Sequence, residues 1–423
     1  MKKILCPNEQ QIKWADCEVG VIIHLDMQVF EPSYFFRDNF DYQPDVSVFN
    51  PEKLDTDKWI EDAVSAGAKY AVLVAKHCSG FCLWPTKQHD YHIGNTPYKN
   101  GNGDIVGEFI ASCKKYGVLP GLYYSVSCNA YYKVDNPGLC ISGDKEEQKC
   151  YNDMVMGQLT ELWTNYGDLF EIWFDGGCLP PEKGGPPIAE LLYKLQKDAI
   201  VFQGPINMGN GIRWVGNERG EAPFDTFATV NFELESFDGM SEETNRGGDP
   251  FGNVWRPAES DVPNRDSQRS FMGGWFWHEG QDAAVFTKEE LFEKYLYSVG
   301  RNTNFLIGMA INNKGLFSDK DKEEFIGFGK MVKEAYGKPL PIIEGDLTED
   351  EYTLTSEKEA KYLVVCEDIK YGERILAYKT DVGIEGKAIG HKRILPLPEG
   401  VKKLTFTILD KKDTCHIKSI ALY

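Results

Sequence analysis

The sequence predicts an α/β protein, with a parallel sheet in the first two-thirds of the chain and a smaller all-β unit behind it. Up to about residue 205, short β-branched runs alternate with amphipathic helical stretches. Four strand–helix pairs in a row imply a parallel sheet with right-handed crossovers. After KPLP (338–341) the pattern changes to short strands separated by turns. The alternation alone does not distinguish a closed barrel from an open sheet.

The elements of the first region follow one another regularly. A helix over 55–68 begins at Asp55, and aspartate caps helices because its carboxylate accepts hydrogen bonds from free N–H groups of the first turn. A helix over 104–117 begins at Asp104 and ends at Gly117. Strands are expected at 19–24, 70–77, 119–126, 169–177 and 199–205, and further helices at 145–167 and near 187–197.

Between about 206 and 285 the alternation gives way to sequence rich in Gly, Asn and Trp, which predicts long functional loops. Helix, strand and helix patterns return at 287–300, 304–310 and 318–337. We therefore expect a first domain over 1–340 and a C-terminal β-sandwich over 341–423. Its strands are expected in KYLVVCE, RILAYKT, KRILPL and KKLTFTIL.

Composition narrows the class of protein. The chain has 423 residues, of which 42% are hydrophobic, so a sizeable core can form. A net charge of -19 disfavours binding to nucleic acid, because a phosphate backbone is repelled. No window is long and apolar enough for a membrane span, and the N-terminal lysines precede no apolar stretch. With 11 scattered cysteines, these features predict a cytoplasmic protein with free thiols.

Polar side chains follow the first four predicted strands at the point where each strand ends. They are His24, His77, Tyr124 and Asp175. In a parallel barrel the carboxyl ends of the strands share one face, and active sites lie on that face. Bulky aromatic residues occur nearby in the sequence, at Trp84, Trp173 and Trp214. A helix cap or turn explains any one of the four, but the set favours a functional site.

Asp175 is the strongest catalytic candidate. In EIWFDGG it follows an apolar strand that holds it rigidly, and two glycines leave space for a ligand, although an aspartate that only bonds its own turn is the alternative. A second carboxyl group is available from Glu218 or Glu221 in RWVGNERGEAP, or from Glu259 or Asp261 in WRPAESDVP. Two carboxyl groups roughly 5 to 5.5 Å apart are what retaining cleavage of a glycosidic bond requires.

Several other classes of site are disfavoured. His89 and His92 have no carboxylate or cysteine at a standard ligand spacing, and Cys78 and Cys82 lack a partner pair, so no metal is expected. No G-x-S-x-G elbow is present. GNGDIVG (101–107) follows a loop rather than a strand, so we interpret it as a turn and expect no dinucleotide cofactor.

A series of motifs resembles a known family. In order along the chain they are GVIIHLDMQVF, the run from FNPEKLD to KQHDY, YNDMVMGQLTELWTNYGDLFEIWFDGG, RWVGNERGEAP, WRPAESDV, GGWFWH and SVGRNTNFLIGM. They resemble the α-L-fucosidases of glycoside hydrolase family 29, particularly the branch that acts on α-1,3/1,4-linked fucose, over about residues 18–335. The resemblance implies a (β/α)8-like barrel with a β-sandwich, a retaining mechanism, no cofactor, and a fucosylated oligosaccharide as substrate.

The resemblance also implies roles for individual residues. Asp175 matches the nucleophile of the WFDG motif, and Glu218 in GNERG resembles the acid/base, with Glu259 as the runner-up. Residues expected to contact the substrate are His24, His77, Trp84, Tyr124, Trp173, Trp214, Glu259, Trp277 and His278. Of these, Trp277 and His278 in GGWFWH are expected to close the rim.

The chain departs from the family pattern at two positions beside the expected pocket. Most relatives have KHHDGF where this sequence has KHCSGF, so Cys78 and Ser79 replace a histidine and an aspartate; HLDMQVF also replaces the usual HFG. A lost imidazole removes one hydrogen bond to the sugar, worth about 1 to 3 kcal/mol if buried. Two alternatives therefore remain, an exo-glycosidase for a different sugar such as an L-galactoside, and a catalytically silent carbohydrate-binding protein.

Overall fold

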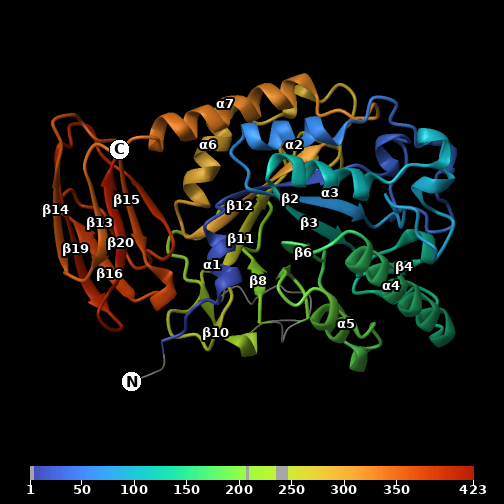
Figure 1. Ribbon diagram of the computed structural model, residues 1–423, viewed down its shortest axis with the longest axis horizontal. Coiled ribbons are helices and arrows are strands. Elements are labelled where there is room, and N and C mark those ends of the chain that lie inside the picture. Colours follow the sequence, from blue (N-terminus) through green and yellow to red (C-terminus); the bar gives the residue numbers. More distant parts are fainter. Residues whose placement is uncertain (1–3, 206–208, 235–245) are drawn as a thin grey trace.

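A computed structural model of the chain describes residues 4–205, 209–234 and 246–423; residues 206–208 and 235–245, within the segment expected to be irregular, lie outside the described residues. The chain forms a closed barrel of eight parallel strands, followed by two antiparallel sheets (Figure 1). This confirms the α/β class, the barrel and the C-terminal β-sandwich. Around the barrel the strands are β1 (Val19–His24), β12 (Thr303–Ala310), β11 (Ala258–Val262), β8 (Gly211–Trp214), β7 (Ile200–Phe202), β6 (Glu171–Trp173), β3 (Leu119–Tyr124) and β2 (Tyr70–Lys76).

Helices surround the barrel, and α2 and α3 begin at the caps that the sequence analysis marks, whereas α1 was not predicted. The Asp55 carboxylate accepts from the backbone N–H of Asp57 at the start of α2, and Asp104 accepts from Gly107 in α3. Helix α3 ends at Gly117, whose φ of 69° lies in the left-handed region that glycine adopts without strain. The helices are α1 (Glu9–Ala15), α2 (Thr56–Ser65), α3 (Ile105–Tyr116), α4 (Lys145–Asn165), α5 (Ile188–Leu195), α6 (Lys288–Tyr297) and α7 (Asp319–Tyr336).

Two barrel strands lie inside the segment that the sequence analysis expects to be irregular, so that expectation is wrong at β8 and β11. Both strands carry charged residues within them, which hides the alternation of a buried strand. The Arg213 guanidinium is buried, and hydrogen bonds to the carbonyls of Arg256 and Phe227, at 3.0 and 2.9 Å, offset the cost of removing its charge from water. A short antiparallel pair, β9 (Thr229–Val230) and β10 (Val254–Trp255), joins these strands outside the barrel.

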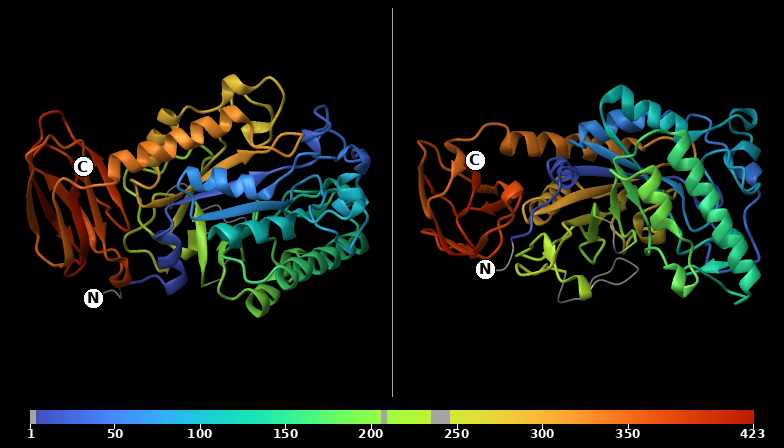
Figure 2. Two further views of the ribbon diagram at one scale, coloured as in Figure 1. Left: turned by 45° about the horizontal axis from the view of Figure 1, so that its top comes forward. Right: turned by 60° about the horizontal axis from the view of Figure 1, so that its bottom comes forward.

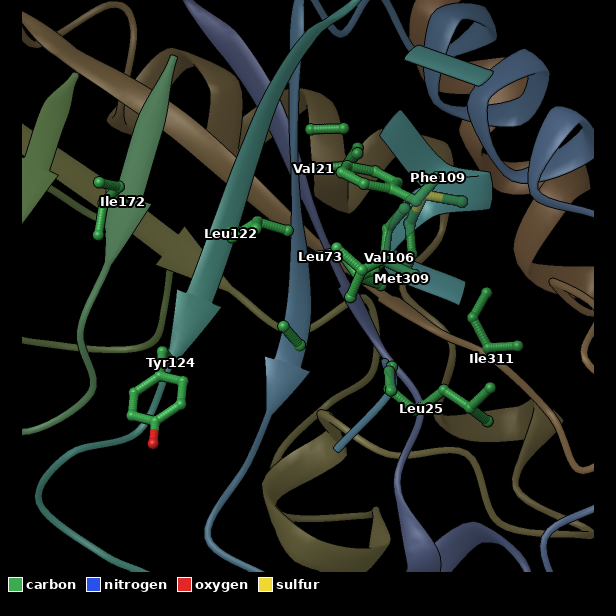
Figure 3. Packing of buried hydrophobic residues seen from close by; sticks show 14 of the residues in the cluster. Val21, Leu25, Leu73, Val106, Phe109, Leu122, Tyr124, Ile172, Met309 and Ile311 are labelled. Atoms are coloured by element: carbon green, nitrogen blue, oxygen red, sulfur yellow. The ribbon is translucent and has the colours of Figure 1, made fainter. Parts of the chain in front are cut away.

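Alternate residues of each strand face two different cores. Side chains on one face fill the barrel interior, including Ile22, Tyr70, Val72, Tyr123, Trp173 and Leu306. Side chains on the other face pack against the helices, and Figure 3 shows Val21, Leu73, Leu122 and Tyr124 in this outer layer with Val106 and Phe109 of α3. Because neighbouring residues on a strand point to opposite faces, one position along the chain decides whether a side chain can reach the interior.

The C-terminal unit is a sandwich of two four-stranded sheets. Apolar side chains from both sheets, among them Tyr352, Leu363, Tyr378 and Phe406, form its separate core. The predicted boundary at 340/341 falls between the end of α7 and the start of β13. The sheets are β13 (Ile342–Leu347), β20 (Ile417–Leu422), β15 (Tyr362–Glu367) and β18 (Arg393–Pro396), and β14 (Glu351–Thr355), β19 (Lys403–Lys411), β16 (Ile375–Thr380) and β17 (Glu385–Gly386).

The sandwich lies beside the barrel at one end of the molecule, and helix α7 leads into it (Figure 2). A buried carboxylate joins the two units: Glu373 accepts from the backbone N–H of Ala228 and, at 2.6 Å, from Asn302 Nδ2. The backbone N–H of His391 donates to Oδ1 of the Asn302 side chain, at 2.7 Å. Among the residues described, no helix combines the length and the apolar character that a membrane span requires.

Candidate active site

A pocket of about 360 Å³ opens at the carboxyl ends of the barrel strands. Its size lies at the lower end of the range for small-molecule sites, which suits a single sugar ring. Of the residues expected from sequence, it brings together His24, His77, Trp173, Asp175 and Glu218. The complete lining is Ile22, His24, Phe35, Phe36, Arg37, His77, Cys78, Tyr123, Trp173, Asp175, Glu218, Asp261, Trp275 and Phe276.

Asp175 follows strand β6 and is held from several sides. The Tyr123 hydroxyl donates to Asp175 Oδ2 at 2.9 Å, and the Ser127 hydroxyl donates to the Asp175 carbonyl at 2.6 Å. Gly176 and Gly177 follow with φ of 67° and 76°, a backbone shape that bulkier residues adopt only with strain. Burial raises the pKa of Asp175, while the Tyr123 hydrogen bond and the Arg37 charge oppose that rise and favour the carboxylate.

Glu218 reaches the pocket from the loop that follows β8. Its side chain keeps a solvent-exposed part, while protein atoms crowd the carboxyl group closely enough for partial burial to raise its pKa. The negative charge of Asp175 raises the pKa further, and a hydrogen bond from Trp275 opposes it. Because solvent still reaches the side chain, we expect a modest shift, in the direction that favours the protonated form.

Asp261 is a third carboxyl group in the pocket. It lies on β11, is buried, and accepts a hydrogen bond from Trp214 Nε1 at 2.7 Å. Burial and then the nearby charge of Glu218 hold its pKa well above the usual value, so Asp261 favours the neutral acid. Glu259, two residues earlier on the same strand, points to the same side but lies one layer deeper in the barrel.

Two histidines also line the pocket. The His77 ring stacks on Tyr123 with ring centroids 5.8 Å apart, and the His24 ring lies 5.0 Å from that of Trp275. Burial lowers the pKa of His24 to about 3 and that of His77 well below its usual value. Both rings are therefore neutral at neutral pH, and a neutral imidazole offers one donor and one acceptor to a sugar hydroxyl.

Comparison with known proteins shows the family of the chain that forms this pocket. The family model described as alpha-L-fucosidase matches residues 13–337, which is more than half of the chain. The chain belongs to this family. The enzyme is a glycoside hydrolase of family 29, an α-L-fucosidase, and fucosylated glycans are its class of substrate. The family resemblance of the sequence motifs is thereby confirmed.

Individual relatives agree over the whole length of the fucosidase. It is 28% identical over 437 residues to alpha-L-fucosidase 1 of Arabidopsis thaliana, covering 92% of this chain and 81% of that protein. A crystal structure from Bacteroides thetaiotaomicron VPI-5482 matches with a TM-score of 0.91 at 29% identity, covering 100% and 99% of the two chains. A Ruminococcus gnavus family 29 fucosidase, solved with fucose, matches with a TM-score of 0.81 at 22% identity over 100% and 95%, a likeness that shows the fold.

Three expected contact residues of the fucosidase lie beside or below the pocket rather than in its lining. Tyr124 faces the helices, where its hydroxyl donates to Gln158 Oε1 at 2.6 Å, and the neighbouring Tyr123 takes the place in the pocket. Trp84 is 1% exposed, and its indole donates to Glu161 Oε2 at 2.9 Å. Trp214 lies behind the lining residues, where its indole N–H donates a hydrogen bond to Asp261.

Glu259, the runner-up for the acid/base, is also outside the lining. It is 0% exposed and accepts hydrogen bonds from Tyr70 at 2.6 Å and from Trp173 Nε1 at 3.0 Å. Burial raises its pKa to about 7, beside the equally buried Glu171. The elevated pKa therefore belongs to a closed interior pair, and Asp261 is the residue of this segment that reaches the pocket.

The rim is formed by different residues of GGWFWH from those expected. Trp275 and Phe276 line the pocket, whereas Trp277 packs against the helical core and His278 lies against Phe271. Arg37 enters from the segment after β1, where no motif marks it in the sequence. Its charge opposes the rise that burial causes in the pKa of Asp175, so with Tyr123 it is a lining residue that the sequence analysis misses.

Proposed function

We propose that this α-L-fucosidase is exo-acting and retains configuration, with Asp175 as nucleophile and Glu218 as acid/base. One observation carries the proposal: two carboxyl groups from the segments after β6 and β8 line one small pocket, and burial raises the pKa of both while the neighbouring charges act on them in opposite directions. Tyr123 and Arg37 favour the charged form of Asp175, and crowding beside Asp175 favours the protonated form of Glu218. A charged nucleophile facing a protonated acid is the arrangement that retaining glycosidases use.

The reaction then proceeds in two displacements. An Asp175 oxygen attacks the anomeric carbon of fucose while Glu218 gives its proton to the departing glycosidic oxygen, leaving a fucosyl ester on Asp175. Glu218, now a carboxylate, takes a proton from water, and the resulting oxygen nucleophile breaks the ester and releases fucose. Two inversions at the same carbon give net retention.

The remaining lining residues suit a deoxy sugar. The neutral rings of His24 and His77 offer hydrogen bonds to hydroxyl groups, and the neutral Asp261 adds a donor. The aromatic faces of Phe36 and Trp275 provide an apolar surface for the C5-methyl side of fucose. The pocket is too small for a chain of sugars, which supports action on terminal fucose.

For the linkage we propose α-1,3/1,4, supported by the motifs that resemble that branch of the family. A second candidate, a different glycone such as an L-galactoside, is favoured by the position of Cys78, which lines the pocket where most relatives have histidine. Ser79 gives no such support, because it does not line the pocket. Its hydroxyl donates a hydrogen bond to Asp26, at 2.6 Å. We further propose a cytoplasmic location, supported by the 11 free cysteines.

Release of sugar from a matched panel tests these proposals. The panel contains 4-nitrophenyl α-L-fucoside, the corresponding α-L-galactoside, and α-1,2-, α-1,3-, α-1,4- and α-1,6-fucosylated oligosaccharides. We expect fastest release from the α-1,3 and α-1,4 linkages. Proton NMR during the first turnovers is expected to show α-fucose before mutarotation; β-fucose as first product would overturn the retaining mechanism. Faster release of L-galactose than of fucose would establish the second candidate.

A further inference from the structure

Three side chains of the pocket form a ligand set of a different kind from the sugar site. His77, Cys78 and Asp175 each offer one ligand atom, and these three atoms lie within 4.8 Å of one another. Imidazole nitrogen, thiolate sulfur and carboxylate oxygen are the ligands of zinc-type cations. With bonds of about 2.0 to 2.3 Å, tetrahedral zinc holds its ligand atoms about 3.5 Å apart, so the side chains must close in by about 1 Å around a bound cation.

The histidine of this set has a buried carboxyl group behind its ring. Asp26 Oδ2 lies 3.8 Å from His77 Nδ1, and neither buried atom has a hydrogen-bond partner among the described residues. The other Asp26 oxygen is held by the Ser79 hydroxyl and the backbone N–H of Met27, at 2.6 and 2.8 Å. With Nδ1 turned toward Asp26, the ring presents Nε2 to the pocket. A hydrogen bond from the ring to a carboxylate is the usual support of metal-binding histidines, and at 3.8 Å the two atoms lie close to the separation that such a bond requires.

We propose that the pocket binds a divalent cation of the zinc type through His77, Cys78 and Asp175, in competition with the sugar. Three protein ligands would leave the fourth position of a tetrahedral site to a water molecule. Binding involves no change of oxidation state: the Cys78 thiol loses its proton to solvent, and the thiolate bonds to the cation. The competition rests on the proposed function, because the cation binds an oxygen of the proposed nucleophile.

Cys78 determines which cations this site accepts. The side chain is 4% exposed, and its sulfur lies 3.6 Å from Ser125 Oγ. Zinc and cobalt bond strongly to sulfur and can take up a thiolate ligand. Magnesium and calcium prefer oxygen ligands and gain little from a thiol, so we expect them to leave the enzyme active.

Cobalt titration tests the site without turnover, since a thiolate bound to Co²⁺ absorbs strongly in the near ultraviolet. All proteins carry Cys6→Ser and Cys150→Ser, which remove the two exposed thiols. This background is compared with the same protein carrying Cys78→Ser, Asp175→Asn or, as matched control, Cys113→Ser. Cys113 is a buried thiol on α3 outside the pocket lining. Asp175→Asn keeps the test decisive if Cys78→Ser folds poorly.

We expect one equivalent of cobalt to produce the absorption in the background protein and in Cys113→Ser, none in Cys78→Ser, and at least tenfold weaker binding in Asp175→Asn. Excess L-fucose is expected to suppress the absorption. Zinc is expected to inhibit fucoside hydrolysis competitively, and Cys78→Ser to need at least tenfold more zinc relative to its own uninhibited rate.

The outcomes separate the cation site from the proposed catalytic roles. No absorption in the background protein, or unchanged absorption or zinc sensitivity in Cys78→Ser, would overturn the cation site even if fucose release is normal. Absorption that depends on Cys78 and Asp175 supports the site even in a protein that releases no fucose, a result that would overturn only the proposed function.

Discussion

The two ends of the barrel interior both hold buried acidic side chains, but only one end is open. At the carboxyl ends of the strands, Asp175, Glu218 and Asp261 line a pocket. At the amino ends, Glu171 and Glu259 lie together, 0% exposed, beneath helix α1. Burial raises the carboxyl pKa at both ends. A perturbed pKa therefore marks a buried acid, and open space beside it marks a site where a substrate can react.

The closed end has its own structural purpose. The Trp14 indole of α1 donates to Glu171 at 3.1 Å, and the Trp173 indole donates to Glu259 at 3.0 Å. The Trp173 ring in turn stacks on Tyr123, with centroids 5.2 Å apart, and Tyr123 holds Asp175. The inner acids thus support the floor of the pocket through aromatic side chains, whereas the outer acids carry the chemistry.

The largest expected difference between the two ends comes from Asp175→Ala. Loss of the nucleophile is expected to lower kcat/KM for fucosides by about 10⁴-fold or more, while the unfolding midpoint changes little, because the side chain faces a cavity. Steady-state kinetics and urea denaturation measure the two effects. Azide, which can enter the vacated space, is expected to restore cleavage of 4-nitrophenyl fucoside; near-normal turnover without azide contradicts the assignment.

Glu218→Gln sharpens the roles within the open end. Without an acid, kcat/KM for oligosaccharides is expected to fall by about 10² to 10⁴-fold, and less for 4-nitrophenyl fucoside, whose leaving group needs no proton. Because the pKa of Glu218 is raised, the acid stays protonated to higher pH and sets the alkaline limb of the rate profile, which the variant is expected to lose. Glu221→Gln, in the same loop but outside the pocket lining, is the control; an equal loss there would show that the loop matters rather than the acid.

At the closed end, Glu259→Ala is expected to act on stability. Tyr70 and Trp173 lose their acceptor inside the barrel, so the free energy of unfolding is expected to fall by about 2 to 4 kcal/mol. Urea denaturation with matched kinetics distinguishes the two ends, since the folded variant is expected to keep kcat within about tenfold. A catalytic loss as large as that of Asp175→Ala, with stability unchanged, would show that Glu259 acts in catalysis rather than in stability.

The smallest effect is expected from Tyr123→Phe, paired with Tyr124→Phe. Removing the hydroxyl that holds Asp175 is expected to lower kcat/KM by about tenfold, or 1.4 kcal/mol. The pKa of Asp175 then rises further, and since the nucleophile must be ionised, the acidic limb moves to higher pH. Tyr124→Phe, whose hydroxyl bonds Gln158 instead, is expected to leave that limb in place. The same shift in both variants would contradict the placement of the two tyrosines.

Much of the fold could be predicted because its signals are local. The caps at Asp55 and Asp104 and the stop at Gly117 act within one helical turn, and the strands β1 to β3 are continuous apolar runs. Strands β8 and β11 escaped prediction because their charged residues are satisfied by partners distant in the sequence. Such strands become recognisable only after the barrel has closed around them.

The site was harder to predict, because a shift of one or two residues along a strand or loop changes which side chain reaches the pocket. Tyr123 and Tyr124 are chemically identical and adjacent, and only the register of β3 decides between them. An irregularity in the neighbouring β2, between Val74 and Lys76, sets the pairing at that point. Asp261 and Glu259 lie on the same strand, and only Asp261 lies far enough toward the carboxyl end of the barrel to reach the pocket. No sequence pattern indicates that depth.

The pairing of β1 with β12 has a consequence for how the protein is made. Val19 lies beside Phe305 and His24 beside Ala310, so the barrel closes through strands from opposite ends of the larger domain. A growing chain on the ribosome keeps the edge of β1 unpaired until the residues of β12 emerge. Exposed strand edges invite pairing with other chains, and contacts so distant in sequence form slowly. The edge of β1 therefore stays available to strands of other chains until β12 is made, and a chain that stops before β12 cannot close the barrel.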